Sequence, residues 1–334
     1  MNAKMLSYAY IMAIADMWCE IGGSSNVEIG ALEPLLWRDG QYRIHDIVNA
    51  LTMRGCRVSL TTNGQLLDIF ARNLSQSGLA LIRTSWHTTN PLVFKEISGG
   101  HGDYDRFLRG IEVALDSGIK LSFNRVLLKD YTDDIPSQLS LIEQYKSRLK
   151  LYTLLWTPQS AETHDRFFQK WQPVVRKYVL PRAVEIVRER KKIGRNRLKF
   201  PLIGGGSVEI KLGEIDRSSA PCDSCSFREM CEESFGDYAR VDPNMNLYFC
   251  YMRRDIGFRL PEYFGRPDDL KHKIQESLGG VDIDSFLTTT PLRLTVTPMC
   301  NFNCRAPGMK HGWCMEESDD YTHPKILPTI LKRE

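Results

Sequence analysis

The sequence predicts an α/β protein whose strands lie parallel in one sheet. Between residues 6 and 156, short runs rich in β-branched and apolar residues alternate with stretches of helical periodicity. Alternation of this kind is typical of βα units. Several predicted strands also end in polar or glycine-containing loops, as at 61–64 and 85–87. In a βα barrel the carboxyl ends of the strands form the active face, so these loops are candidates for the functional site.

The first element is an amphipathic helix over 6–21, followed by a turn at Gly22-Gly23. The alternation then predicts strands at 27–30, 57–62, 81–85, 120–127 and 151–156, and helices at 41–54, 65–77, 103–117 and 134–148. We expect residues 161–200 to be helical and residues 267–278 to form a short helix. The last predicted strand, 292–297, is β-branched and alternating, and it leads directly into Cys300.

The composition is that of a globular protein long enough for two domains. The chain has 334 residues, of which 42% are hydrophobic, and this excludes disordered, collagen-like and coiled-coil classes. Lys and Arg total 44 against 41 Asp and Glu, and a net charge of +3 does not favour nucleic acid as a partner. The longest apolar stretch, 5–18, is interrupted by Asp16 and only weakly imitates a secretory signal. We therefore expect a cytoplasmic protein with no membrane partner.

Four segments are predicted from shifts in composition. Residues 1–160 carry the βα units, 161–206 form a basic helical linker, 207–285 form a cysteine-rich domain, and 286–334 carry the last strand and its loop. Pro201 and the glycines at 204–206 mark one boundary. The run 176–199 holds ten Lys and Arg against two Glu. It is either a solvated helix face or a surface that docks phosphate or peptide.

Seven of the nine cysteines fall in the last third of the chain, in two groups. The first group is Cys222, Cys225, Cys231 and Cys250, and the second is Cys300, Cys304 and Cys314. Thiolates on tight loops bind a soft metal ion or an iron–sulfur cluster. Four ligands close such a site, whereas three leave one position open for a substrate or cofactor. The alternatives are a structural zinc knuckle for the first group and ordinary buried thiols for the second.

The other two cysteines, Cys19 and Cys56, stand in apolar helix and strand contexts. We expect both of them in the core.

Residues 292–304 (LRLTVTPMCNFNC) resemble the first strand and cluster loop of radical S-adenosylmethionine (SAM) enzymes. Residues 33–39 (EPLLWRD) resemble the glycine-glycine-glutamate-proline loop of that family, and 61–67 (TTNGQLL), 83–85 and 110–124 match further stretches. The resemblance covers about residues 6–160 and 215–320. It is greatest to the branch that contains the GTP cyclase of the molybdopterin pathway and peptide-modifying enzymes.

The matching segments occur in a rotated order, because the family carries the cluster loop near its N-terminus. The resemblance therefore implies a partial (β/α)6 TIM-like barrel that is circularly permuted, with its first strand at the C-terminus. Such a rearrangement is physically tolerable, since a strand needs its neighbours in space rather than in sequence. The alternative is a rearranged or truncated gene.

Two positions depart from the family pattern. The usual C-x3-C-x2-C spacing puts the third ligand at Pro307, so Cys314 must serve instead. The glycine pair that approaches the methionine amine of SAM is replaced by Ala31 and Leu32. The four-cysteine group resembles the auxiliary-cluster domain of twitch or SPASM type, in which a hairpin such as 242–250 delivers a late cysteine ligand.

The resemblance implies a 4Fe–4S cluster on Cys300, Cys304 and Cys314, whose open iron binds the amine and carboxylate of SAM. Reductive cleavage then gives a 5′-deoxyadenosyl radical that abstracts hydrogen from the substrate, and the electron comes from a donor such as flavodoxin or ferredoxin. A second iron–sulfur cluster, expected to be 4Fe–4S, is implied on the four-cysteine group at 222–250.

The resemblance also implies the contacts with SAM. Phe302 is expected beside the adenine, Ala31, Leu32 and Glu33 near the methionine amine, Ser85 and Asn124 near the ribose, and Arg125 at the carboxylate. His87 is the candidate catalytic residue, for substrate contact or proton transfer. The alternatives are that Phe302 packs the loop, that Ser85 and Asn124 cap strand ends, and that His87 is a hydrogen-bonded structural histidine.

The predicted function is that of a radical SAM enzyme acting on a peptide or a small natural product. The GTP cyclase is disfavoured because Cys225 is followed by 226–228 (SFR) and an additional cysteine, and no Gly-Gly tail closes the chain. One rival is a non-catalytic scaffold that binds zinc or an iron–sulfur cluster. The other is an RNA-modifying radical SAM enzyme, supported only by the basic run 176–199, and it predicts RNA affinity that falls steeply with salt.

Overall fold

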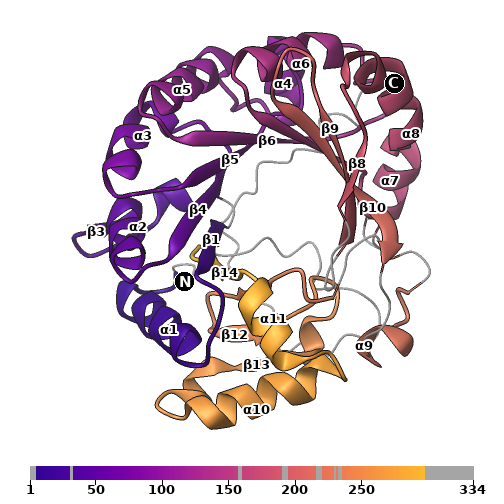
Figure 1. Cartoon of the computed structure of the whole chain (residues 1–334). Helices are drawn as coiled ribbons and strands as arrows, with labels where there is room; N and C mark the ends of the chain where they lie inside the picture. Colours follow the sequence, from indigo (N-terminus) through magenta and orange to yellow (C-terminus); the bar gives the residue numbers. More distant parts are fainter. Residues whose placement is uncertain are drawn as a thin grey trace.

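The computed structural model describes residues 5–30, 33–156, 160–189, 195–215, 220–228, 231 and 235–297. Its centre is one curved sheet with helices on the outer, convex side (Figure 1). The strands, in spatial order, are β13 (Phe258–Arg259), β12 (Asn246–Tyr248), β11 (Ala239–Val241), β14 (Leu292–Thr295), β1 (Asn26–Gly30), β4 (Arg57–Thr62), β5 (Leu81–Ser85), β6 (Lys120–Val126), β7 (Arg148–Tyr152), β10 (Ser207–Ile215), β9 (Arg195–Pro201) and β8 (Val187–Glu189). A separate hairpin joins β2 (Arg38–Asp39) and β3 (Tyr42–Arg43).

The strands from β11 through β14, β1, β4, β5, β6 and β7 to β10 are all parallel, as βα units require. The helices are α1 (Tyr8–Glu20), α2 (Ile44–Met53), α3 (Leu67–Gln76), α4 (Pro91–Ile97), α5 (Tyr104–Asp116), α6 (Ile135–Gln144), α7 (Ala161–Phe167), α8 (Trp171–Val174), α9 (Ala220–Asp223), α10 (Pro267–Leu278) and α11 (Ile283–Thr289). Helices α2, α3, α5 and α6 cover the convex side of the arc in Figure 1, so the fold is an α/β arrangement of TIM-barrel kind.

The core lies between the helices and the convex side of the sheet. It includes Ile47 and Leu51 on α2, Ile111 on α5, and Leu60 and Phe123 on the strands, all with no exposed surface. Along β4 the burial alternates, because one face of the strand meets the helices and the other faces the interior of the arc. The packing of helices on one face of the sheet therefore explains both the amphipathic pattern of the helices and the alternating burial along β4.

β14, the strand that follows α11, lies beside the N-terminal part of the chain. β14 pairs in parallel with β1, with Leu294 opposite Ile29. Beyond its end, the amide of Val296 donates to the carbonyl of Gly30 over 3.3 Å, and the carbonyl of Val296 accepts from the amide of Leu6 over 3.1 Å. The segment that precedes Cys300 in sequence thus lies beside the first strand and the start of the first helix.

Two sequence predictions on secondary structure are corrected. The single helix expected over 161–200 is instead two short helices, α7 and α8, with further helical turns up to residue 182, and β8 and β9 follow. β9 pairs antiparallel with β10 and β8, and Arg197 on β9 forms an ion pair with Glu209 on β10 at 2.8 Å, so cross-strand pairing accommodates this basic segment. The strand expected at 151–156 spans 148–152 instead. Among the described helices, none is long and apolar enough to cross a membrane.

Candidate active site

The carboxyl ends of β1, β4, β5 and β6 meet at one edge of the sheet. The register places Thr62 on β4 opposite Thr84 on β5, and Ser85 at the end of β5 opposite Asn124 on β6. Two of the residues expected at SAM are therefore neighbours on adjacent strands. The amide oxygen Oδ1 of Asn124 is buried and accepts no hydrogen bond from the described residues.

Glu33 follows β1 and caps the short 3-10 turn at Pro34–Leu36. Its buried carboxylate accepts hydrogen bonds from the amide of Leu35 (3.0 Å), the amide of Asn63 (2.8 Å) and the hydroxyl of Thr62 (2.8 Å). Burial raises the pKa of Glu33, and these hydrogen bonds oppose the rise. The carboxylate therefore fastens the loop after β1 to the end of β4, which gives the residue a structural purpose besides any contact with SAM.

A cavity of about 520 Å³ opens beside these strand ends. Its volume is within the range of small-molecule sites. It lies between the ends of β4 and β5 and helix α4, and its walls include Asn63, Gln65, Ser85, His87, Thr88, Phe94, Ile97, Ser98, His101 and Gly102. The structure thus brings Ser85 and His87, both singled out in the sequence, to one ligand-sized space.

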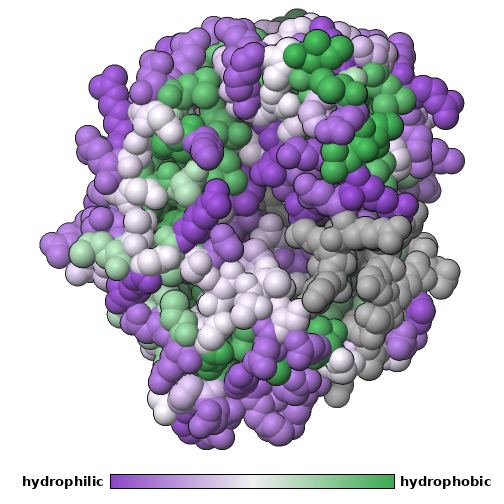
Figure 2. All heavy atoms as spheres, viewed as in Figure 1, coloured by the Kyte–Doolittle hydropathy of each residue, from purple (hydrophilic) through white to green (hydrophobic). Residues whose placement is uncertain are grey.

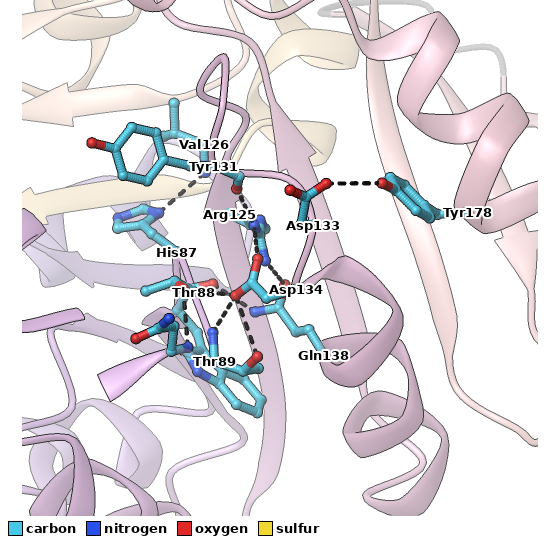
Figure 3. A network of polar contacts seen from close by, with 12 residues as sticks. His87, Thr88, Thr89, Arg125, Val126, Tyr131, Asp133, Asp134, Gln138 and Tyr178 are labelled. Carbon is cyan, nitrogen blue, oxygen red and sulfur yellow. Dashed lines mark hydrogen bonds and ion pairs between the residues drawn. The ribbon is translucent and has the colours of Figure 1, made fainter. Parts of the chain in front are cut away.

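His87 is held in one tautomer. The backbone amide of Val126 donates to Nδ1 of His87 over 3.1 Å, so Nδ1 is an acceptor and the neutral ring carries its hydrogen on Nε2 (Figure 3). Burial, together with the nearby positive charge of Arg125, lowers the pKa of His87 to about 4. At neutral pH the side chain is an uncharged hydrogen-bond donor, which suits ligand contact better than proton transfer.

Arg125 lies in a buried network behind His87 (Figure 3). Its guanidinium donates to Gln138 Oε1 (2.9 Å), to the carbonyl of Tyr131 (2.6 Å) and to Asp134 Oδ1 (2.6 Å). The side chain has no exposed surface. This placement does not match the expected contact with the carboxylate of SAM, because Arg125 would have to leave three partners to make it.

The same network fixes the loop that carries His87. Asp134 Oδ2 accepts hydrogen bonds from the hydroxyl of Thr88 (2.7 Å) and from the amide of Thr89. Gln138 Nε2 donates to the carbonyl of Trp86 over 2.7 Å. The first turn of α6 therefore holds the segment after β5 in place, and the sequence analysis did not identify this role for either residue.

The interior of the arc is charged, which the sequence analysis also missed. Glu28 on β1 pairs with Arg83 on β5 (3.0 Å) and with Arg293 on β14 (3.4 Å). Hydrophilic residues gather around the hollow in the middle of the face shown in Figure 2. The only sign of this charged interior in the sequence is Glu28, a single charged residue within an apolar strand. Such a residue is equally expected in a strand whose second face meets solvent.

The four cysteines Cys222, Cys225, Cys231 and Cys250 line one small cavity of about 30 Å³. Its walls are otherwise largely apolar and include Phe235, Met252 and Ile256, with Arg228 and Arg253 at the side. Cys250 is buried, and burial raises the pKa of its thiol to about 11. Within the described part of the chain, no three Cys, His, Asp or Glu side chains are grouped closely enough to hold a single metal ion.

Ala31, Leu32, Cys300, Phe302, Cys304 and Cys314 lie outside the described residues. The expectation that Cys19 and Cys56 both lie in the core is half right, since Cys56 is buried and Cys19 is exposed. Cys19 lies in the last turn of α1, where the helix faces solvent.

The sequence was compared with known families and proteins. The sequence model of the Radical SAM superfamily matches residues 2–139. A probable GTP 3′,8-cyclase of Methanococcus vannielii is 36% identical over 235 residues, which cover 70% of this chain and 74% of that protein. A GTP 3′,8-cyclase of Xanthomonas campestris pv. campestris is 33% identical over 129 residues, which cover 34% of this chain and only 38% of the relative.

Among solved structures, SuiB of Streptococcus suis is similar with a TM-score of 0.37 and 18% identity, over 44% of this chain and 34% of SuiB. That likeness is too slight to support a conclusion. The match to the Methanococcus protein extends over most of both chains and agrees with the family model. On these grounds the chain belongs to the radical SAM superfamily, a family of enzymes.

Proposed function

We propose that this chain cleaves SAM reductively and that the resulting 5′-deoxyadenosyl radical abstracts hydrogen from a substrate in the barrel. The observation that carries the proposal is the position of β14 beside β1. The chain leaves β14 toward Cys300, and at Val296 it is hydrogen-bonded to Gly30, three residues before Glu33. A cluster loop that starts there would begin next to the loop that Glu33 anchors. The same adjacency supports the circularly permuted order of the barrel segments.

Cys300, Cys304 and Cys314 are the proposed ligands of the SAM cluster, which supplies one-electron reduction of SAM when bound. The residues around the strand ends have separate tasks. Glu33 fixes the loop after β1, Ser85 and Asn124 are the proposed contacts of the ribose, and the Nε2 hydrogen of His87 is donated to an acceptor in the cavity. The surrounding walls exclude water from the radical.

The four-cysteine cavity supports a second iron–sulfur cluster. Four thiols line one largely apolar space, and thiolates are the ligands that iron–sulfur clusters take. Arg228 and Arg253 lie in the wall beside the cysteines, where their positive charge would stabilise the negative charge of a cluster. We therefore propose an auxiliary-cluster role of twitch or SPASM type for the segment that carries these cysteines, with electrons supplied by an external flavodoxin or ferredoxin.

The comparisons do not support the peptide substrate expected from the sequence. The matched relatives carry the name GTP 3′,8-cyclase, which makes a small molecule of nucleotide size the leading substrate class. A small natural product remains the second candidate. The scaffold and RNA-modifying alternatives have no observation in their favour beyond those in the sequence.

The test is iron and acid-labile sulfide per chain in anaerobically reconstituted protein, for wild type, Cys314→Ala and Cys231→Ala. We expect about eight irons in wild type and a loss of about four in each variant, since each cluster holds four. The EPR signal of the reduced protein should change on addition of SAM in wild type and Cys231→Ala, but not in Cys314→Ala. About four irons in wild type and Cys314→Ala, with no effect of SAM, would favour the scaffold.

A further inference from the structure

Two cysteines, Cys19 and Cys56, have no part in the proposed clusters. Cys19 is exposed in the last turn of α1, whereas Cys56, directly before β4, is only 6% exposed. Helices α1 and α2 are neighbours on the outer side of the arc (Figure 1), and Cys56 follows the turn that ends α2. An accessible thiol and a buried thiol thus stand on two adjoining parts of the first βα unit.

An ion pair joins α1 to the turn that precedes Cys56. The guanidinium Nε of Arg54 donates to Asp16 Oδ1 over 2.7 Å. Asp16 and Cys19 are three positions apart in α1, so their side chains lie on the same face of the helix. Arg54 and Cys56 are two positions apart in the turn after α2. The face of α1 that carries Cys19 is therefore the face that meets the turn of Cys56.

A second contact lies on the other side of the two cysteines. The amide of Arg57, next to Cys56 in the chain, donates to the carbonyl of Ser25 over 2.8 Å, and Ser25 lies in the short connection between α1 and β1. The two thiols also act on each other, because burial and the neighbouring Cys19 thiol together raise the pKa of Cys56 to about 11. The fold itself therefore holds Cys19 and Cys56 side by side.

We propose that Cys19 and Cys56 form a redox modification site, which reacts with a low-molecular-weight disulfide such as oxidised glutathione and closes to a reversible Cys19–Cys56 disulfide. Cys19 is the attacking thiol because it is exposed to solvent. Cys56 is the resolving thiol because burial keeps the reagent away from it. The site is separate from both proposed clusters, and the inference does not rest on the proposed function.

The reaction consists of two thiol–disulfide exchanges. The thiolate of Cys19 attacks one sulfur of the reagent, a bond forms between these two sulfurs, and the other half of the reagent leaves and takes up the proton that Cys19 lost. Cys56 then loses its proton and attacks Cys19 Sγ, and the second half of the reagent leaves and takes up that proton. The protein gives up two electrons and two protons, and the reagent is reduced to two thiols. Since burial keeps Cys56 protonated at neutral pH, the second exchange is the slower one.

The cross-link would enclose the first βα unit. The closed loop runs from residue 19 to residue 56 and contains β1, the loop of Glu33 and α2. A disulfide stabilises a protein mainly by restricting the unfolded chain, and more so for a longer loop. Cys56 lies at the amino end of β4, whereas the candidate active site lies at the carboxyl ends of the strands. We therefore expect oxidation to stabilise the fold and to leave SAM binding unchanged.

The test treats the anaerobically reconstituted protein, freed of reductant, with oxidised glutathione, alkylates the remaining thiols and identifies disulfides by mass spectrometry. Trypsin places Cys19 in peptide 5–38 and Cys56 in peptide 55–57, because it cleaves after Lys4, Arg38, Arg54 and Arg57. We expect a glutathione adduct on Cys19 first, and then the two peptides joined in most chains. Dithiothreitol should separate them again.

Two variants separate the two exchanges. Cys56→Ser should stop at the glutathione adduct on Cys19, and Cys56→Ala replaces it if Ser at this buried position does not fold. In Cys19→Ser, Cys56 should stay unmodified. Oxidation should raise the urea midpoint of wild type but of neither variant. Iron content and the effect of SAM on the EPR signal are recorded on the same samples, so failure of the proposed radical chemistry is seen separately from failure of this inference.

A glutathione adduct that persists on Cys19 in wild type, with no joined peptides, would overturn the inference, because the two sulfurs would then be unable to meet. So would a pair that stays unmodified in wild type, or a disulfide from Cys19 to a cysteine other than Cys56. Modification of Cys56 in Cys19→Ser would contradict the assigned order of attack and overturn the inference as well.

Discussion

The amide of Val126 and the imidazole of His87 join β6 to the loop after β5 through a hydrogen bond of 3.1 Å to Nδ1. We predict that His87 stays neutral, with its hydrogen on Nε2, down to about pH 4. Nitrogen chemical shifts of histidine-labelled protein identify the tautomer directly. Since the unfolded chain takes up this proton near pH 6.5 and the folded chain only near 4, the free energy of unfolding should fall as pH drops across that range, by up to about 3 kcal/mol.

Two substitutions distinguish the roles of the two ring nitrogens of His87. Asn reproduces an acceptor at Nδ1, whereas Gln reproduces a donor at Nε2. Both variants should lose the pH dependence described above. SAM or substrate affinity should fall more in His87→Asn than in His87→Gln, and the reverse order would show that the donor into the cavity is not used.

We predict that Glu33 contributes both to the stability of the protein and to the geometry of the SAM site. Glu33→Ala leaves the amides of Leu35 and Asn63 without their acceptor, at a cost of about 3 kcal/mol in the free energy of unfolding. Urea unfolding measures this, with Glu112→Ala on the exposed face of α5 as a control that should change stability by less than about 0.5 kcal/mol. Calorimetry on the folded variant should show weaker SAM binding, and unchanged affinity would restrict Glu33 to stability.

Arg125 and Asp134 should behave as one buried unit. Removal of either partner alone leaves a buried charge uncompensated, so Arg125→Gln and Asp134→Asn should each destabilise the protein by about 3–5 kcal/mol. The double variant should lose less than the sum, because the two changes remove the same interaction. Additive effects in urea unfolding would mean that the network of Figure 3 does not couple α6 to the loop of His87.

The extent to which the sequence predicts the fold depends on local signals. The strands at 57–62 and 81–85 were predicted to the residue, because their alternation is bounded by glycine and polar turns. Residues 195–201 were not, since helix and strand propensities are similar there and the strand forms by pairing with β10 and β8, which the local sequence does not reveal. The α4 helix and β10 were also missed.

Part of the candidate site was also predictable from local signals in the sequence. Glu33, Ser85, Asn124 and His87 stand at strand ends, and parallel strands bring such positions together. Glu28 and Glu209 stand in the middle of strands, where a charged residue usually marks a solvent face. Only the curvature of the sheet encloses that face, and curvature is a property of the whole assembly rather than of any one strand.

Gly64, which follows Thr62 and Asn63 at the end of β4, is predicted to be intolerant of any side chain. Its φ is +84°, and a Cβ would lie 2.7 Å from the ring of the buried Phe107 and 2.8 Å from Thr84 Oγ1. Gly118 is a matched control, because its φ is +76° and a Cβ there would have nothing within 4 Å. Gly118→Ala should cost about 1 kcal/mol of backbone strain alone.

Gly64→Ala should cost about 3 kcal/mol or more, because Phe107 or Thr84 must also move. The amide of Gly64 donates to Thr62 Oγ1 over 3.1 Å, and Thr62 in turn donates to Glu33. A shift at Gly64 therefore reaches the loop that Glu33 anchors, and SAM affinity should fall in Gly64→Ala but not in Gly118→Ala. Urea unfolding and calorimetry on both variants test this, and equal costs would show that the close packing around Gly64 adds nothing to its backbone requirement.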